Sequence, residues 1–506
     1  MASRLNSRIR GNDERAPRYH SRAMPLENLL RHVDWGAVYT ASAWTIRIAA
    51  LVYVPQRRPP AAARAWLLLI FFLPWPGLVL YLLIGRAYMP RRRYRLQRQI
   101  HELARRLVPR PDRAEAAVDD VVTPELKPAL RLADALSEFP PVGGCTFELL
   151  PDFDAAIARV IAEIDGARRY VHVLVYIFED DEVGRAVADA LARAARRGVA
   201  VRVLMDAIGS RRGLRHLAPA LRAAGAEAIA VMPLRLWGPN AARFDLRNHR
   251  KIVVVDGAAA YFGSQNVVSA RANRGMVNEE LLVRATGPIV AHLEAVLLAD
   301  RYLETGDVPP ESNPLAPLPA DPATTGLAQV VPSGPGYSEG TAEAVMVALM
   351  YGARTRVVLT SPYVVPSEAF IAAMIAAARR GVAVDLIVDA ESNKPLVQLA
   401  QQSFYDAMLR AGVRIHRHFG SFLHAKHMSI DGEVALIGSS NFDIRSFALN
   451  AEVSVLIFDH GVVAALADVQ ARYLARCEAV TLESRRALPL PRRALENLAR
   501  LTDSLL

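Results

Sequence analysis

Cysteine is nearly absent from this chain of 506 residues, which holds only Cys145 and Cys477. Two cysteines cannot form a disulfide framework, and without a cluster of cysteine and histidine they do not suggest a zinc site. Acidic residues are too few to balance the basic ones, so the formal net charge is +10. This excess favours an anionic partner, either a nucleic acid or an acidic membrane surface. The length allows two or more domains with sizeable cores.

Two long apolar segments lie near the N-terminus, after a basic tail over residues 1–34 that we expect to be disordered. Residues 35–54 and 66–84 are each about long enough to cross the ~30 Å hydrocarbon core of a bilayer, although the first contains an arginine and the second two prolines. We therefore predict a transmembrane hairpin over residues 35–90. Its late start argues against a cleaved signal peptide. Arginine-rich flanks on both sides predict that both ends, and the catalytic domains, face the cytoplasm.

The rest of the chain has the pattern of two copies of one α/β unit. A strand, a helix and a second strand are predicted in each copy, at 170–178, 182–197 and 199–205, and again at 356–364, 367–380 and 382–388. The letters Ala-Arg-Arg-Gly-Val-Ala-Val occur in both copies. The expected order is a juxtamembrane linker or helix at 91–140, a first domain at 141–305, a proline-rich linker at 306–329, a second domain at 330–485 and a C-terminal helix at 486–506.

One motif of eighteen residues occurs once in each copy, with the same residue types at the same spacing. Its members are His249, Lys251, Asp256, Ser264 and Asn266 in the first copy, and His424, Lys426, Asp431, Ser439 and Asn441 in the second. Alternate residues of a strand share a face, so each histidine should lie beside its lysine. Each aspartate precedes a glycine between two strand-like runs. We expect it to shape a hairpin rather than react, although it belongs to the catalytic motif.

Placed face to face, the two copies would supply the groups that cleave a phosphodiester. One histidine would attack phosphorus and form a covalent phospho-histidine, and the other would protonate the leaving alkoxide. The lysines, asparagines and serines would hold the phosphate oxygens. This chemistry needs no metal or other cofactor, in keeping with the lack of a carboxylate cluster near either motif. The symmetry leaves open which histidine is the nucleophile.

A histidine that works this way needs its far ring nitrogen oriented by an acid or a carbonyl group. The frame Asn-x-Glu follows each motif, at 278–280 and 450–452. It selects Glu280 and Glu452 as the orienting carboxylates, with Glu279 as the alternative in the first copy.

The doubled motif resembles the signature of the phospholipase D superfamily, and its surroundings resemble the bacterial cardiolipin synthases within it. The supporting phrases are Arg247-Asn-His-Arg-Lys251, the run 420–426, the run 441–452 and the N-terminal apolar hairpin. The resemblance implies two phospholipase D-type α/β domains forming a pseudo-twofold pair. It also implies a multi-pass phosphatidyltransferase of the bacterial inner or plasma membrane. This enzyme would join two phosphatidylglycerol molecules into cardiolipin and release glycerol, with His249 as nucleophile and His424 as acid and base. The chain departs from the family at Ala451, where an aromatic residue is frequent, and in its long basic tail.

Three other functions are compatible with the same residues. Water in place of the second lipid would make the protein a hydrolytic phospholipase D that yields phosphatidic acid. The same chemistry on DNA or RNA would make it a nuclease, but the membrane hairpin argues against this, and we expect phospholipids and an anionic membrane as partners and no nucleic acid. A non-catalytic membrane scaffold is disfavoured because both motifs are intact.

Overall fold

The computed structural model divides into two compact units, residues 1–85 and 86–506. It describes residues 34–58, 60–85, 91–108, 118, 121–137, 139–233, 246–273, 275–310, 326–334, 337, 340–392 and 394–501. The predicted basic tail, most of the proline-rich linker and the last five residues lie outside these ranges. The domain boundaries inside the second unit remain a prediction.

The first unit is a small helical bundle. It consists of α2 (Trp35–Tyr53), α3 (Pro60–Phe72), α4 (Pro74–Leu80) and the π-helical turn η1 (Tyr81–Gly85). The carboxylate of Asp34 caps α2 by accepting the backbone N–H groups of Gly36 and Ala37. Trp66, Ile70 and Tyr81 lie in its core.

The predicted second membrane segment, 66–84, is not one helix. The chain breaks at Leu73 because Pro74, which has no N–H group to continue the helix, starts a new one. Among the helices of the described residues, none combines the length and the apolar character that crossing a membrane would require. The predicted transmembrane hairpin is therefore not confirmed.

The second unit is built on one sheet of fifteen strands. From the centre outwards, the first half contributes β1 (Val142–Leu150), β8 (Leu282–Thr286), β6 (Ala259–Gly263), β5 (Ile252–Val255), β2 (Tyr170–Val175), β3 (Ala200–Asp206) and β4 (Glu227–Val231). The second half contributes β9 (Gly326–Ser333), β16 (Glu452–Phe458), β15 (Val434–Gly438), β14 (His427–Ile430), β10 (Arg356–Ser361), β11 (Ala383–Asp389), β12 (Arg414–His418) and an extra edge strand, β17 (Cys477–Val480). Both halves have the same strand order, and they join where β1 runs antiparallel to β9. The predicted pair of repeated α/β domains is confirmed.

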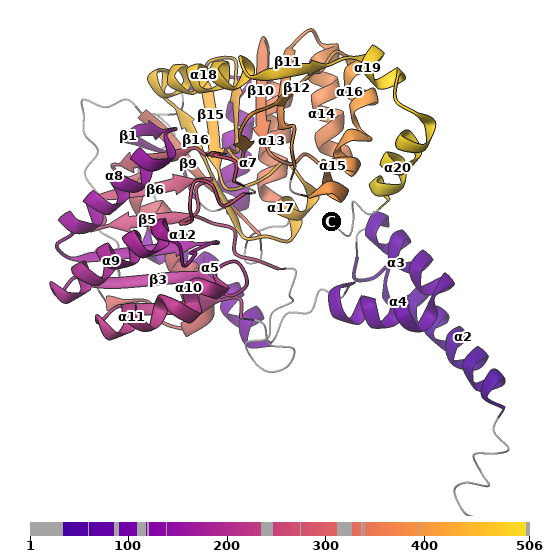
Figure 1. The fold of residues 1–506 in the computed structure, drawn as a ribbon, viewed down its shortest axis with the longest axis horizontal. Helices are drawn as coiled ribbons and strands as arrows, with labels where there is room; N and C mark the ends of the chain where they lie inside the picture. The colour runs from indigo at the N-terminus through magenta and orange to yellow at the C-terminus, as the bar shows by residue number, and fades with distance from the viewer. Residues whose placement is uncertain are drawn as a thin grey trace, which may run out of the picture. The chain divides into compact units, whose positions relative to one another are not determined.

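Helices cover this sheet, and Figure 1 shows the two halves side by side, in magenta and in orange to yellow. The first half carries α8 (Phe153–Gly166), α9 (Glu182–Arg196), α10 (Arg211–His216), α11 (Ala218–Ala223) and α12 (Ile289–Thr305), preceded by α5 (Arg91–Leu107) and α7 (Lys127–Ser137). The second half carries α13 (Thr341–Gly352), α14 (Glu368–Arg379), α15 (Pro395–Gln402), α16 (Tyr405–Ala411), α17 (Ile444–Ala448), α18 (His460–Leu474), α19 (Leu482–Arg486) and α20 (Leu490–Arg500). α12 is buried along nearly its whole length and packs against β5 of the first half and β9 of the second.

The motif aspartates hold two hairpin turns, as the Asp-Gly pairs predict. Asp256 and Asp431 follow β5 and β14 and adopt positive φ angles of 53° and 54°. The Asp431 carboxylate accepts the backbone N–H groups of Arg354, Thr355 and Arg356 at 2.7, 2.8 and 2.8 Å. Asp256 makes the equivalent bonds to the backbone before β2. Each aspartate therefore ties its hairpin to the start of the neighbouring antiparallel strand, β2 or β10.

We expect Asp431→Ala to lower the free energy of unfolding by about 3 kcal/mol. It removes a buried acceptor of several N–H groups and puts alanine at a positive φ angle. Asp431→Asn, which keeps one acceptor oxygen and tolerates this φ angle, should cost about half as much. Thermal unfolding of the three proteins measures the difference. Equal melting temperatures for wild type and Asp431→Ala would contradict this structural role.

Candidate active site

The two motif histidines lie just before their strands rather than inside them. β5 begins at Ile252 and β14 at His427, so the predicted single strand through each His-x-Lys sequence is wrong. The reason is that each histidine segment pairs with the opposite half of the protein. The N–H of His249 donates to the carbonyl of Ala451 at 2.9 Å, and that of His424 donates to the carbonyl of Glu279 at 2.8 Å. In the second case two short strands, β13 (Phe422–Leu423) and β7 (Asn278–Glu279), run parallel.

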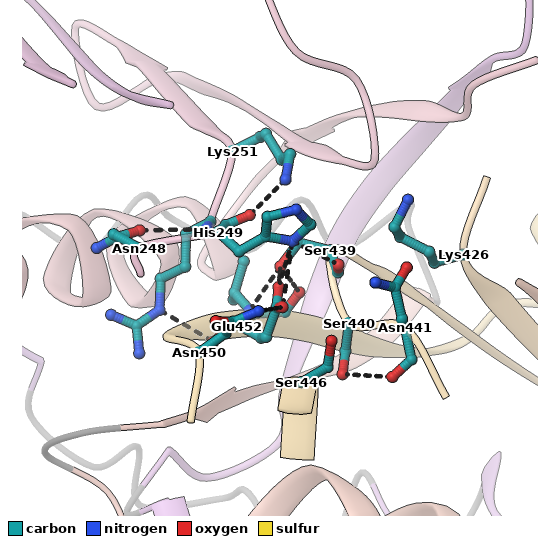
Figure 2. A network of polar contacts seen from close by, with 12 residues as sticks. Asn248, His249, Lys251, Lys426, Ser439, Ser440, Asn441, Ser446, Asn450 and Glu452 are labelled. Atoms are coloured by element: carbon teal, nitrogen blue, oxygen red, sulfur yellow. Dashed lines mark hydrogen bonds and ion pairs between the residues drawn. The ribbon is translucent and has the colours of Figure 1, made fainter. Parts of the chain in front are cut away.

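Because each histidine segment pairs with the other half, each histidine lies beside the glutamate of that other half. His249 Nδ1 lies 3.1 and 3.2 Å from the two carboxylate oxygens of Glu452, as Figure 2 shows. His424 Nδ1 lies 2.7 Å from Oε1 of Glu280. Both carboxylates are fully buried, whereas the imidazoles keep some exposure, 12% and 16% of their side chains. Because each Nδ1–H points at a carboxylate, each Nε2 carries the lone pair that a nucleophile or base needs.

The motif serines hold the glutamates. The hydroxyl of Ser264 donates to Glu280 at 2.5 Å, and that of Ser439 donates to Glu452 at 2.6 Å. Each serine oxygen in turn accepts a backbone N–H from the residue after the glutamate, at 3.0 Å in both halves. The expectation that the serines hold phosphate oxygens is therefore corrected, because their hydrogens are directed to the carboxylates.

The motif lysines are buried beside the histidines. Lys251 Nζ donates to the carbonyl of His249 at 2.6 Å, and Lys426 Nζ donates to that of His424. Burial lowers the pKa of Lys251 to about 8 and that of Lys426 to about 7, although Glu280 and Glu452 oppose this shift. Bound negative charge would therefore favour the protonated, cationic form of both lysines.

The motif asparagines lie in the same site. Asn441 lies beside Lys426 in Figure 2, and both are buried. The side-chain oxygen of Asn266 accepts the backbone N–H of Ile177 at 3.1 Å, which leaves its amide nitrogen to donate elsewhere.

Burial lowers the pKa of both His249 and His424 to about 4. The facing glutamates counteract this effect, and the lysines add to it. Burial also acts to raise the pKa of each glutamate, but the contact with its histidine and the nearby lysines hold it below the usual value. Both imidazoles are therefore neutral near pH 7 until a ligand changes the charge of the site.

Several supporting residues were not among the predicted site residues. Asp206 and Asp389, at the ends of equivalent strands, accept the backbone N–H of the residue before each histidine, at 3.0 and 2.9 Å. Their matching positions in the two copies were the available signal. Tyr176 packs on His249, with 4.7 Å between ring centres. Glu279, the alternative orienting acid, instead accepts hydrogen bonds from Ser421 and Arg476.

Comparisons with known proteins give family matches in both halves of the chain. Residues 160–300 and 346–473 match the family Cardiolipin synthase, PLD-like domain, and residues 45–86 match the family Phospholipase D-nuclease N-terminal. The chain is 32% identical over 452 residues to cardiolipin synthase A of Yersinia pseudotuberculosis and to that of Yersinia pestis, covering 88% of this chain and 92% of each relative.

A solved structure shares the fold at low sequence identity. The crystal structure of phosphatidylserine synthase from Haemophilus influenzae aligns with a TM-score of 0.57 and 17% identity, over 76% of this chain and all of that one. Together with the family match in both halves, the identity to the Yersinia proteins shows that the chain belongs to the cardiolipin synthase family of phospholipase D-like proteins.

Proposed function

We propose that the protein is a cardiolipin synthase, which transfers a phosphatidyl group from one phosphatidylglycerol to another and releases glycerol. The observation that supports this most directly is the pair of crossed histidine–glutamate contacts, which gives one site two oriented imidazoles. One can act on phosphorus and the other on the leaving oxygen. The family relatives named cardiolipin synthase A supply the lipid substrate class.

In the first step, Nε2 of His249 attacks phosphorus and the bond from phosphorus to the glycerol oxygen breaks. Glu452 stabilises the positive charge that grows on the His249 ring as the N–P bond forms. His424, protonated and facing Glu280, gives its proton to the departing glycerol oxygen. The products are a phosphatidyl-histidine, free glycerol and a neutral His424.

In the second step, the terminal hydroxyl of another phosphatidylglycerol gives its proton to His424 and attacks the same phosphorus. The N–P bond breaks, cardiolipin leaves and His249 regains its lone pair. Lys251, Lys426 and the amides of Asn266 and Asn441 would hold the non-bridging oxygens, where negative charge concentrates in each transition state. With water in place of this hydroxyl, the same steps would give phosphatidic acid.

We also propose that the first unit attaches the enzyme to the bacterial inner membrane, as the hairpin expected from sequence, with the catalytic halves on the cytoplasmic side. Many large apolar side chains of its helices point away from its own core. Phe72 is 79% exposed, Trp35 63%, and Ile48 and Leu68 60% each. Apolar surface on this scale is typical of a lipid or partner contact rather than of a water-facing helix.

The roles of the two histidines can be separated with a phosphodiester whose leaving group is a good one, such as a p-nitrophenyl ester. His424→Ala should still form the covalent intermediate on this substrate, because such a leaving group needs no proton. The variant lacks the base for the second step, so the covalent intermediate should accumulate and the reaction should give a burst of about one nitrophenolate per site. His249→Ala should give no burst and no mass increase in the intact protein. The reverse pattern would make His424 the nucleophile, and a burst in neither variant would contradict covalent catalysis.

The crossed pairing predicts a pH effect of Glu280 on His424. The negative charge of Glu280 raises the pKa of His424, so Glu280→Gln should lower this pKa further. His424 then loses its proton at a lower pH, so the alkaline limb of the pH profile of kcat/KM should move to lower pH. Activity at pH 7 should fall about 10²-fold or more. Glu279→Gln is the control, since the Glu279 carboxylate pairs with Ser421 and Arg476 and with neither imidazole, and its backbone bond to His424 is kept in the variant. An alkaline limb that moves to higher pH in Glu280→Gln would count against this pairing.

Membrane attachment is tested by replacing Ile48, Leu68 and Phe72 together with serine. We expect the variant to leave the membrane pellet during an alkaline carbonate wash that the wild type resists, because three exposed apolar side chains would be lost from the proposed lipid contact. Activity on detergent-dispersed substrate should be unchanged. Tyr351→Ser, at an exposed aromatic residue of α13, is the matched control. A triple variant that stays in the pellet would refute attachment through these helices.

A further inference from the structure

α20 packs on the catalytic unit with its charged side and turns its leucines outward. Leu490, Leu495, Leu498 and Leu501 are 77%, 47%, 61% and 70% exposed, whereas Glu496 is 1% exposed. At 100° per residue the four leucines occupy one side of the helix, opposite Glu496, and the buried Ala499 lies at the edge of that side next to Leu495. This is the reverse of the usual arrangement for a helix on the surface of a soluble domain.

Polar contacts, not the leucines, hold α20 in place. Glu496 pairs with Arg485 at 2.7 Å and with Arg492 at 3.4 Å. Arg492 also donates to Gln402 of α15 at 2.9 Å, and the guanidinium of Arg500 stacks over Phe404 at 4.7 Å. Since the leucines stay about half or more exposed while these polar contacts are made, their exposure requires another explanation.

The charge around the leucines identifies the kind of surface that would cover them. The segment from Leu482 to Leu501 contains five arginines and two glutamates. Arg485 and Glu496 are buried together in an ion pair, which leaves four arginines and one glutamate outside this pair. A helix with an apolar stripe and a basic border is typical of a segment that lies in the interface of an anionic bilayer. A soluble acidic partner would be attracted by the arginines, but it would leave the leucines unsatisfied.

The position of α20 connects this surface to the active site. α20 packs against α15, and the first turn of α15 exposes Leu396, which is 46% exposed. Lys394 directly precedes α15. Its Nζ lies 4.7 Å from the ring centre of Tyr363, and its charge contributes to the lowered pKa of the catalytic-site Lys426. α15 therefore packs against the leucine-bearing helix, and the lysine that precedes α15 carries a charge that acts on the active site.

We propose that the outward face of α20, together with Leu396, docks on the surface of a bilayer rich in anionic phospholipid and brings the active-site entrance to the lipid headgroups. This contact is separate from the attachment proposed for the first unit. Its link to substrate entry rests on the proposed function, but the docking itself does not.

Docking is measured on the full-length protein reconstituted in vesicles. An environment-sensitive fluorophore is placed at Leu498→Cys in a Cys477→Ser background, where the remaining Cys145 is buried. In vesicles containing phosphatidylglycerol, we expect a blue shift and quenching by lipids that carry a nitroxide on the acyl chain, and weaker quenching in pure phosphatidylcholine. The same label at the exposed Asp468→Cys, on α18, should not be quenched.

Absence of lipid quenching at position 498 would overturn the proposal, as would equal quenching at position 468. A blue shift that needs no vesicles and grows with protein concentration would also overturn it, because it would assign the face to a second copy of the chain. Lipid quenching at position 498 in an enzyme that makes no cardiolipin would refute the proposed function and leave the docking intact.

The consequence for catalysis is measured with Leu495→Glu/Leu498→Glu. We expect cardiolipin formation on phosphatidylglycerol vesicles to fall about tenfold, because two carboxylates would oppose docking to an anionic surface. Formation in detergent micelles should stay within about twofold of wild type, since neither leucine is part of the active site. Tyr351→Glu, the matched loss of an exposed apolar side chain, should change neither. Equal losses in vesicles and micelles, or no loss in vesicles, would contradict a role of docking in substrate entry.

Discussion

The exchange of glutamates between the two halves is the constraint on which the site depends. His249 is oriented by Glu452, and His424 by Glu280, so neither half can orient its own histidine. A small rotation of one half against the other would break both contacts and bury two unpaired carboxylates, which is costly. The relative placement of the two halves must therefore be held firmly.

Two features hold the halves together. The β1–β9 pairing makes the sheet continuous, so the junction is made of backbone hydrogen bonds as well as side chains. Arg250, next to the first histidine, is fully buried and crosses the junction. It donates to the carbonyls of Glu452 at 2.9 Å and Ser333 at 2.8 Å and pairs with Asp300 of its own half. Its charge is satisfied on every side, and it fixes the backbone of the residue that orients His249.

The sequence predicted the repeat, the hairpin aspartates and the two glutamates because each of these depends on local spacing and occurs twice. It could not predict that each histidine pairs with the glutamate of the other half. The Asn-x-Glu frame occurs in both halves and does not show which glutamate faces which histidine. The role of Ser264 was misjudged for a similar reason. Its partner Glu280 lies sixteen residues away, and the pairing of β6 with β8 brings the two together. Arg250 gave no signal because the second copy has Ala425 at that position.

The N-terminal segments show a different limit. The number of apolar residues predicted a membrane span across 66–84. That number takes no account of Pro74, which has no N–H group to continue the preceding helix and begins a new one. Hydropathy reports how much apolar surface a segment can offer, whereas continuity of the helix depends on single backbone groups. The exposed side chains of this unit retain the apolar character that the count detected.

The electrostatics of the site favour catalysis only once substrate is bound. Burial and two neighbouring lysines keep His249 neutral, which suits a nucleophile, but the same effects keep His424 neutral, which does not suit an acid. A phosphodiester carries one negative charge into this space, and that charge stabilises both lysines as cations and raises the pKa of His424. The lysines then offset the phosphate charge that would otherwise hinder attack by His249. The substrate anion thus completes the protonation state that the proposed cleavage requires, and Glu280 stabilises the added proton on His424, the proposed acid, as Glu452 stabilises positive charge on His249.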